Sequence, residues 1–132
     1  MGQQQLLLIV LSVIIISMAI YAGTRMFDYY NADSARERVL QEAKFLVQFA
    51  EQYKLRSTQT GGGGGSYTGF VLTKFFIDEP DIGYWVSGSG QNLQVYACSY
   101  GADAVKGEDG LNPVAVLLTK RGSSGITVRT LN

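Results

Sequence analysis

The chain has 132 residues, enough for one domain or for a small domain with an appendage, and its 11 Lys and Arg residues balance 11 Asp and Glu residues. A net charge of zero gives no reason to expect nucleic acid as a partner, because phosphate binding needs a basic patch. Histidine is absent and cysteine occurs once, at Cys98, which excludes an intrachain disulfide, a zinc site of His and Cys, and a Cys–His catalytic pair, so we expect neither an enzyme nor a cofactor.

The first predicted element is an apolar helix near the N-terminus. Residues 6–22 read LLLIVLSVIIISMAIYA and carry no charge. A helix of this length spans about 25 Å, near the minimum for crossing a bilayer core, and it is too long for a buried strand. A secretory signal peptide is the alternative, but such peptides begin with a positively charged region. No Lys or Arg precedes Leu6, and the sequence after Ala22 runs into more helix, which favours a retained membrane helix over residues 1–27.

Residues 28–56 are predicted to continue the same helix with an amphipathic character. Apolar residues recur there at steps of three and four, which places them on one helical face. Phe45 and Phe49 form a second apolar pair outside this stripe. Two apolar faces indicate a helix that touches its own domain on one side and another surface on the other. The stripe consists of Ala32, Ala35, Val39, Ala43, Leu46, Ala50 and Tyr53.

Local signals suggest where this helix changes and where it ends. The segment Ser34-Ala35-Arg36-Glu37 fits a capping box, which predicts a bend or a restart near Asp33. The apolar pattern fades at residues 55–57. We therefore expect one helix of roughly fifty residues, apolar all round in its first half and amphipathic in its second.

A glycine-rich loop is expected at residues 57–66, which read STQTGGGGGS. Five consecutive glycines lose much backbone entropy on ordering and have no side chain to pack. The favoured interpretation is a flexible joint between the helix and the head. The alternative is a close-approach loop, in which the bare backbone packs against a neighbouring surface.

Residues 67–132 are predicted to form an antiparallel β head. Residues 67–77 (YTGFVLTKFFI) are apolar and are ambiguous between a strand and a short helix. Four strand-like runs follow, separated by Gly- and Ser-rich turns, which indicates an antiparallel meander. Cys98 lies in one of these runs and is interpreted as a buried small hydrophobic residue. The runs are residues 83–87, 92–100, 114–120 and 126–131.

The last two runs offer a face for packing on the helix. Val114, Val116 and Leu118 alternate along one run, and Ile126 and Val128 alternate along the next. We expect these side chains to contribute to the sheet face that packs on the helix stripe. The predicted fold class is therefore α+β, a long N-terminal helix packed on a small antiparallel sheet of about four strands.

The order of a half-apolar long helix, a variable loop and a four-stranded meander resembles the type IV pilins and the pseudopilins of type II secretion. The resemblance covers the whole chain in architecture and residues 1–56 in detail. The segments that carry it are MGQQQLLLIVLSVIIISMAI and the amphipathic continuation to Tyr53.

This resemblance implies a structural subunit of a surface filament that polymerises through its hydrophobic helix. In that family a leader is cleaved, the new N-terminal residue is methylated, and the helix anchors the subunit in the inner membrane before it enters the filament core. The implied partners are identical subunits, the inner membrane and the pilus assembly machinery. The implied modified N-terminus is Met1; the alternative is cleavage after Gly2, which would leave Gln3 first and fits the family less well. The implied subunit interface consists of Met1, Gln5, Leu6, Leu7, Leu8, Ile9, Val10, Leu11, Val13, Ile14, Ile15, Ile16, Met18 and Ile20.

The chain departs from the family in its charge and in its helix breaker. The family usually has a glutamate at the fifth mature position, whereas this chain has Gln5, whose side-chain carbonyl can still accept a hydrogen bond from an ammonium group. The family's mid-helix proline is missing. Gly23 stands close to that place, and since Gly costs about 1 kcal/mol relative to Ala in a helix, we expect a weak point there in the assembled state.

One acidic loop resembles the calcium-binding loops of some pseudopilins. It contains Asp103, Glu108 and Asp109 among glycines. Calcium takes six to eight oxygen ligands, and three irregularly spaced carboxylates equally fit a solvated turn, so no metal is assigned.

Two alternatives to a pilus subunit stay open. One is a pseudopilin, acting as a short piston in a secretion machine. The other is a single-pass membrane-anchored module whose sheet recognises a ligand. An amphipathic half that continues well beyond the apolar block favours assembly, since a simple anchor needs only the block.

Overall fold

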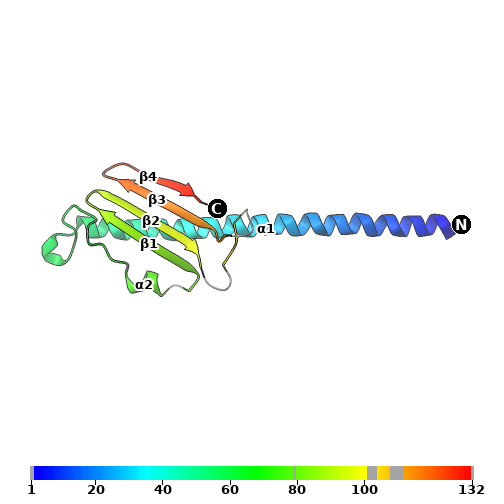
Figure 1. Cartoon of the computed structure of the whole chain (residues 1–132), viewed down its shortest axis with the longest axis horizontal. Coiled ribbons are helices and arrows are strands. Elements are labelled where there is room, and N and C mark those ends of the chain that lie inside the picture. The colour runs from blue at the N-terminus through cyan, green and yellow to red at the C-terminus, as the bar shows by residue number, and fades with distance from the viewer. Residues whose placement is uncertain (1, 79, 101–103, 108–111, 132) are drawn as a thin grey trace. The chain divides into compact units, whose positions relative to one another are not determined.

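A computed structural model describes residues 2–78, 80–100, 104–107 and 112–131 (Figure 1). It confirms the predicted α+β class: a long N-terminal helix packs on a four-stranded antiparallel sheet with the strand order β1-β2-β3-β4. Two compact units divide the chain, Met1–Asn31 and Ala32–Asn132. The elements are α1 (Gly2–Leu55), η1 (Thr58–Thr60), α2 (Lys74–Ile77), β1 (Ile82–Ser89), β2 (Asn92–Ser99), β3 (Ala115–Arg121) and β4 (Ile126–Thr130).

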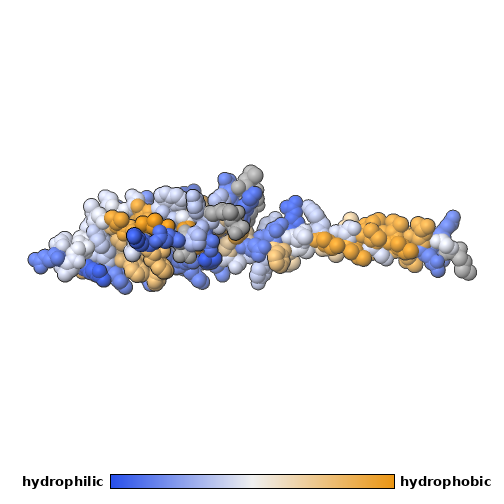
Figure 2. All heavy atoms as spheres, turned by 90° about the horizontal axis from the view of Figure 1, so that it is seen from below, coloured by the Kyte–Doolittle hydropathy of each residue, from blue (hydrophilic) through white to orange (hydrophobic). Residues whose placement is uncertain are grey.

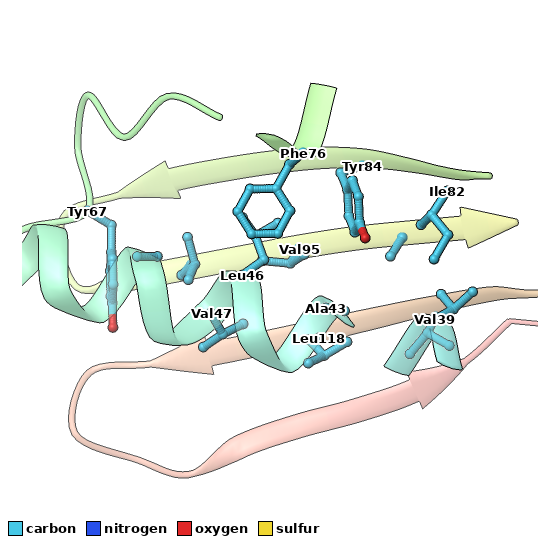
Figure 3. Close-up of a cluster of buried hydrophobic side chains, with 14 residues drawn as sticks. Val39, Ala43, Leu46, Val47, Tyr67, Phe76, Ile82, Tyr84, Val95 and Leu118 are labelled. Carbon is cyan, nitrogen blue, oxygen red and sulfur yellow. The ribbon is translucent and has the colours of Figure 1, made fainter. Parts of the chain in front are cut away.

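The core of the second unit lies between the C-terminal half of α1 and the inner face of the sheet (Figure 3). Leu46 and Val47 of the helix are at most 1% exposed, as are Val95 and Leu118 of the sheet. The predicted stripe supplies most of the buried helix positions, because every third or fourth side chain falls on one face. The buried residues of α1 are Ala32, Val39, Ala43, Leu46, Val47 and Ala50.

Polar contacts at the margins of this core join the helix to the sheet. The hydroxyl of Tyr84 donates a hydrogen bond of 2.6 Å to the carboxylate of Glu42. Lys120 of β3 forms an ion pair with Glu51 of the helix. Hydrogen bonds to a charged group contribute about 1.5–3 kcal/mol, so these contacts help to fix the register of the helix on the sheet.

Two buried titratable side chains in this unit avoid ionisation. Cys98 is 6% exposed, which confirms the predicted buried position, and burial raises the pKa of its thiol. Tyr67 is fully buried, and burial likewise raises the pKa of its phenol. Both groups therefore favour the neutral form in the folded chain.

The predicted sheet face is correct for one strand and wrong for the other. Val114, Val116 and Leu118 are at most 1% exposed, as expected. Ile126 and Val128 are 38% and 39% exposed, because β4 is an edge strand that pairs only with β3 and all five of its residues are exposed. The residues 67–77, ambiguous in sequence, contain the short helix α2 and no strand.

The predicted restart of the helix near Asp33 is wrong. The helix α1 runs without a break from Gly2 to Leu55, and Ser34 lies within it. The side chain of Asp33 accepts a hydrogen bond of 3.1 Å from Arg36. A capping box matters where backbone N–H groups lack partners, and here the helical ladder supplies them.

The glycine run is a bonded loop, so the favoured interpretation as a flexible joint is wrong and the close-approach alternative is correct. The N–H groups of Gly63 and Gly65 donate to carbonyls in the last turn of α1, which have no partner within the helix, and the N–H group of Gly64 donates to the carbonyl just beyond it. Left-handed backbone at Gly61, Gly64 and Gly65, with φ of 79°, 56° and 94°, allows the chain to turn there. The bonds run from Gly63 to Tyr53 (2.8 Å), from Gly64 to Arg56 (2.9 Å) and from Gly65 to Lys54 (2.8 Å).

The close approach also explains why side chains are absent from this loop. A Cβ atom added to Gly62 would overlap the Cβ and carbonyl of Arg56. One added to Gly63 would overlap the carbonyl oxygen of Ser66 and lie 2.9 Å from the ring of Tyr53. The entropic cost of ordering the glycines is thus offset by hydrogen bonds that larger residues could not reach.

Candidate assembly surface

The first unit carries a long exposed apolar segment. The twelve large apolar side chains between Leu6 and Ile20 are between 48% and 69% exposed. Figure 2 shows them as an apolar band near the N-terminal end of α1. Soluble monomers rarely expose contiguous apolar patches above a few hundred Å², so this band needs a covering partner or medium.

The polar groups of this segment are satisfied within the helix. Ser12 donates a hydrogen bond of 2.7 Å to the carbonyl of Leu8, and Ser17 donates one of 2.7 Å to the carbonyl of Val13. These are the only polar side chains between Leu6 and Ile20. A helix that pairs all its polar groups internally can enter an apolar medium without unsatisfied donors.

By length and composition, α1 is able to cross a membrane. None of its apolar window is buried within the structure, which separates it from the core helix of a globular domain. The coarse prediction of a possible transmembrane segment is therefore supported. A membrane anchor and a signal sequence both satisfy this criterion.

Two other predicted site residues, Gln5 and Gly23, both lie in α1. Gln5 is exposed in the first turns of α1. Gly23 lies inside the continuous helix, with open space where a side chain would be. The weak point expected at Gly23 concerns the assembled state and stays a prediction.

Several predicted residues fall outside the described part of the chain. Met1, the implied modified N-terminus, is one of them, and so are Asp103, Glu108 and Asp109 of the acidic loop. Among the described residues, no group of three His, Cys, Asp or Glu side chains could hold a metal ion.

The second unit carries a smaller apolar surface that sequence reasoning found only in part. Phe45 and Phe49 are 48% and 40% exposed, as expected for a second helix face, and their ring centroids lie 5.2 Å apart. Phe76 of α2 packs against Phe49 at 5.8 Å, and its neighbour Phe75 is 67% exposed. The side chains Gln41, Glu42, Phe45, Phe75 and Phe76 line a hollow of about 290 Å³.

We call the exposed rings of Phe45, Phe49 and Phe75 the phenylalanine surface. The apolar run at residues 67–77 indicated the α2 part of this surface. The sequence did not show that α2 packs beside Phe45 and Phe49 of α1. In Figure 2, which views the molecule from the side on which Figure 1 draws α2, apolar side chains gather on the second unit. The surface gives the head an apolar contact area of its own.

No family model, curated protein or solved structure matches this chain. The function must therefore be argued from the chain's own residues.

Proposed function

We propose that this chain is the structural subunit of a type IV pilus-like surface filament, polymerising through residues 6–22. The observation that carries the proposal is the exposed apolar segment of α1, whose large side chains are 48–69% exposed and whose helix continues into the folded head. In identical subunits, such segments can cover one another by packing side by side. The hydrophobic effect then drives assembly, at roughly 25 cal/mol for each Å² of apolar surface removed from water.

The phenylalanine surface supports assembly over a simple anchor. A membrane anchor would need only the apolar segment, which already has the necessary length. The phenylalanine surface belongs to the second unit, outside residues 6–22, and its three rings are 40–67% exposed. A second apolar contact area is useful to a subunit that meets several copies of itself.

The processing and assembly that we propose for the subunit are those of the families that it resembles. It is inserted in the inner membrane as a single-pass precursor, processed and methylated at Met1, and moved by an assembly machinery into an extracellular filament. The pseudopilin role, a short piston in secretion, is a variant of the same proposal. No catalytic activity is proposed.

A single-pass membrane-anchored binding module is the second candidate. It is favoured by the length and apolarity of α1, which suffice for a membrane span without any assembly.

Electron microscopy of sheared surface material, combined with the N-terminal mass of the subunit, tests the proposal. The full chain should yield filaments, whereas a chain that begins at Asp28 and keeps the core position Ala32 should be soluble and monomeric. Filaments from the truncated chain would show that the apolar segment does not drive assembly. A full chain that stays in the membrane fraction without filaments would favour the anchored binding module instead.

A further inference from the structure

The outer face of the sheet has a composition unlike the rest of the chain. Side chains alternate along each strand, so that Tyr84 and Val95 face the core while Trp85 and Gln94 face outward. The strand register places Trp85 opposite Tyr96 and Ser87 opposite Gln94. The outward side chains therefore form cross-strand rows that can be considered as one surface.

One end of this face is an aromatic platform. Trp85 is 56% exposed, and its ring packs against Tyr96 with centroids 5.5 Å apart and planes at 61°. A Cβ atom added to Gly83 would lie 3.2 Å from the indole, so the glycine leaves room for the ring along the strand. An exposed indole held in place by its neighbours is a stacking surface for a flat apolar group.

The other end of this face is polar and hollowed. The side chains Ser87, Ser89, Asn92, Gln94, Thr119 and Arg121 line a hollow of about 270 Å³. A second hollow of about 420 Å³ adjoins it and shares Thr119 and Arg121 with it. Neutral hydroxyl and amide groups thus dominate both hollows, with one guanidinium between them.

Among the residues of the four strands, the charged side chains on this face are all positive. None of the four strands contains Asp or Glu. Arg121 and Arg129 are exposed, and among the described residues neither forms an ion pair. Lys120, the other basic residue of these strands, is engaged with Glu51. A ligand that complements this face is therefore rich in hydroxyl groups and carries negative charge.

We propose that the outer face of the sheet binds a carboxylated polysaccharide, such as a polymer of uronic acids. A pyranose ring stacks on Trp85, ring hydroxyls exchange hydrogen bonds with the Ser, Thr, Asn and Gln side chains, and carboxylates pair with Arg121 and Arg129. Ser89 lies four residues beyond Trp85, about 13 Å along the strand, so the site fits several sugar units. Two guanidinium groups among many neutral groups suit a hydroxyl-rich chain better than a phosphate backbone.

The binding site goes beyond the proposed filament and can be tested without one. Trp85 is the only tryptophan in the chain, so its fluorescence reports directly on the platform. The full chain, kept in detergent micelles, is titrated with oligogalacturonate and with a neutral dextran oligomer of equal length. Oligogalacturonate should produce a saturable change in fluorescence, and dextran should produce a much weaker one.

Matched charge-neutralising variants locate the carboxylate contacts. Arg121→Gln and Arg129→Gln should each weaken oligogalacturonate binding about three- to fivefold, since exposed charge pairs have modest strength. The double variant should weaken it about ten- to twenty-five-fold, because the effects of separate sites multiply. Arg56→Gln removes the same charge from an exposed site at the end of α1 and should leave binding unchanged.

Four results would overturn the proposal. The first is the absence of any saturable fluorescence change. The second is equal binding of dextran and oligogalacturonate, and the third is undiminished binding by the arginine double variant. The fourth is tighter binding of a DNA duplex with a steep dependence on salt, which would assign the face to nucleic acid.

Discussion

Replacing Gly63 with alanine tests the loop that closes the C-terminal end of α1. The added Cβ would overlap the carbonyl oxygen of Ser66 and lie 2.9 Å from the ring of Tyr53. Ser66 cannot easily move away, because its hydroxyl bonds to Thr68 at 2.9 Å and to the carbonyl of Gly90 at 3.1 Å. The backbone must therefore shift, and the bond of 2.8 Å from Gly63 to Tyr53 is weakened or lost.

The expected loss of stability is large for a surface loop. Overpacking costs about 1–3 kcal/mol and a lost hydrogen bond costs about 1 kcal/mol, so Gly63→Ala should lower the free energy of unfolding by about 2–4 kcal/mol. Gly61→Ala meets no atom within 4 Å but has a φ of 79°, so it should cost about 1 kcal/mol. Gly125→Ala meets no atom within 4 Å, lacks a positive φ and serves as the unstrained control.

Urea unfolding of the full chain in mild detergent, followed by the fluorescence of Trp85, measures all three variants. The predicted order of midpoints is Gly125→Ala highest, Gly61→Ala intermediate and Gly63→Ala lowest. A flexible joint would give a different result, because alanine would then stabilise slightly, by about 0.4–1 kcal/mol, through the unfolded state. A Gly63→Ala variant as stable as Gly125→Ala would refute the close-approach loop.

Three further predictions concern the core, the pH dependence and the assembly contact. Leu46→Ala should lower the free energy of unfolding in urea by about 2–5 kcal/mol, because Leu46 is fully buried. Leu55→Ala, at a position 85% exposed, should leave it unchanged, and equal effects of the two variants would contradict the core assignment. Burial raises the pKa of Cys98 and of Tyr67, so the unfolded chain loses these protons at lower pH than the folded chain does. The free energy of unfolding should therefore be full below about pH 8.5 and should fall as the pH rises above it. A free energy of unfolding that rises with alkaline pH would refute this. Gln5→Leu should reduce filament yield at equal subunit levels and Gln5→Glu should not, because a hydrogen bond to the terminal ammonium contributes about 1.5–3 kcal/mol. A wild-type yield from Gln5→Leu would show that apolar packing alone suffices for assembly.

The parts of the fold that depend on local periodicity could be predicted from the sequence. The helix stripe around Val39 and Leu46 repeats every three to four residues, and the strands alternate every two. Each pattern therefore shows which face of its element is buried. The exposure of Ile126 could not be read in this way, because it depends on which strand forms the edge of the sheet. Alternation indicates the inward side of β4 but not whether the helix covers it.

The glycine loop and the two surfaces depend on contacts between distant segments. Five glycines suggest flexibility when only entropy is considered, and the carbonyls of Tyr53 and Lys54 that order them become visible only in the folded chain. In the same way, the partners of Phe45 on α2 and the row that joins Trp85 to Tyr96 follow from tertiary packing and strand register. The exposed segment from Leu6 onward was predictable, because a helix that is apolar on every side shows an apolar surface whichever face packs.

A density map of the sheared filaments at side-chain resolution tests the central claim most directly. The proposal predicts that residues 6–22 of neighbouring subunits pack against one another in the filament core, with Leu6 and Ile20 shielded from solvent. Filaments joined only through the sheet or the phenylalanine surface, with residues 6–22 lying outside the subunit contacts, would contradict the proposal.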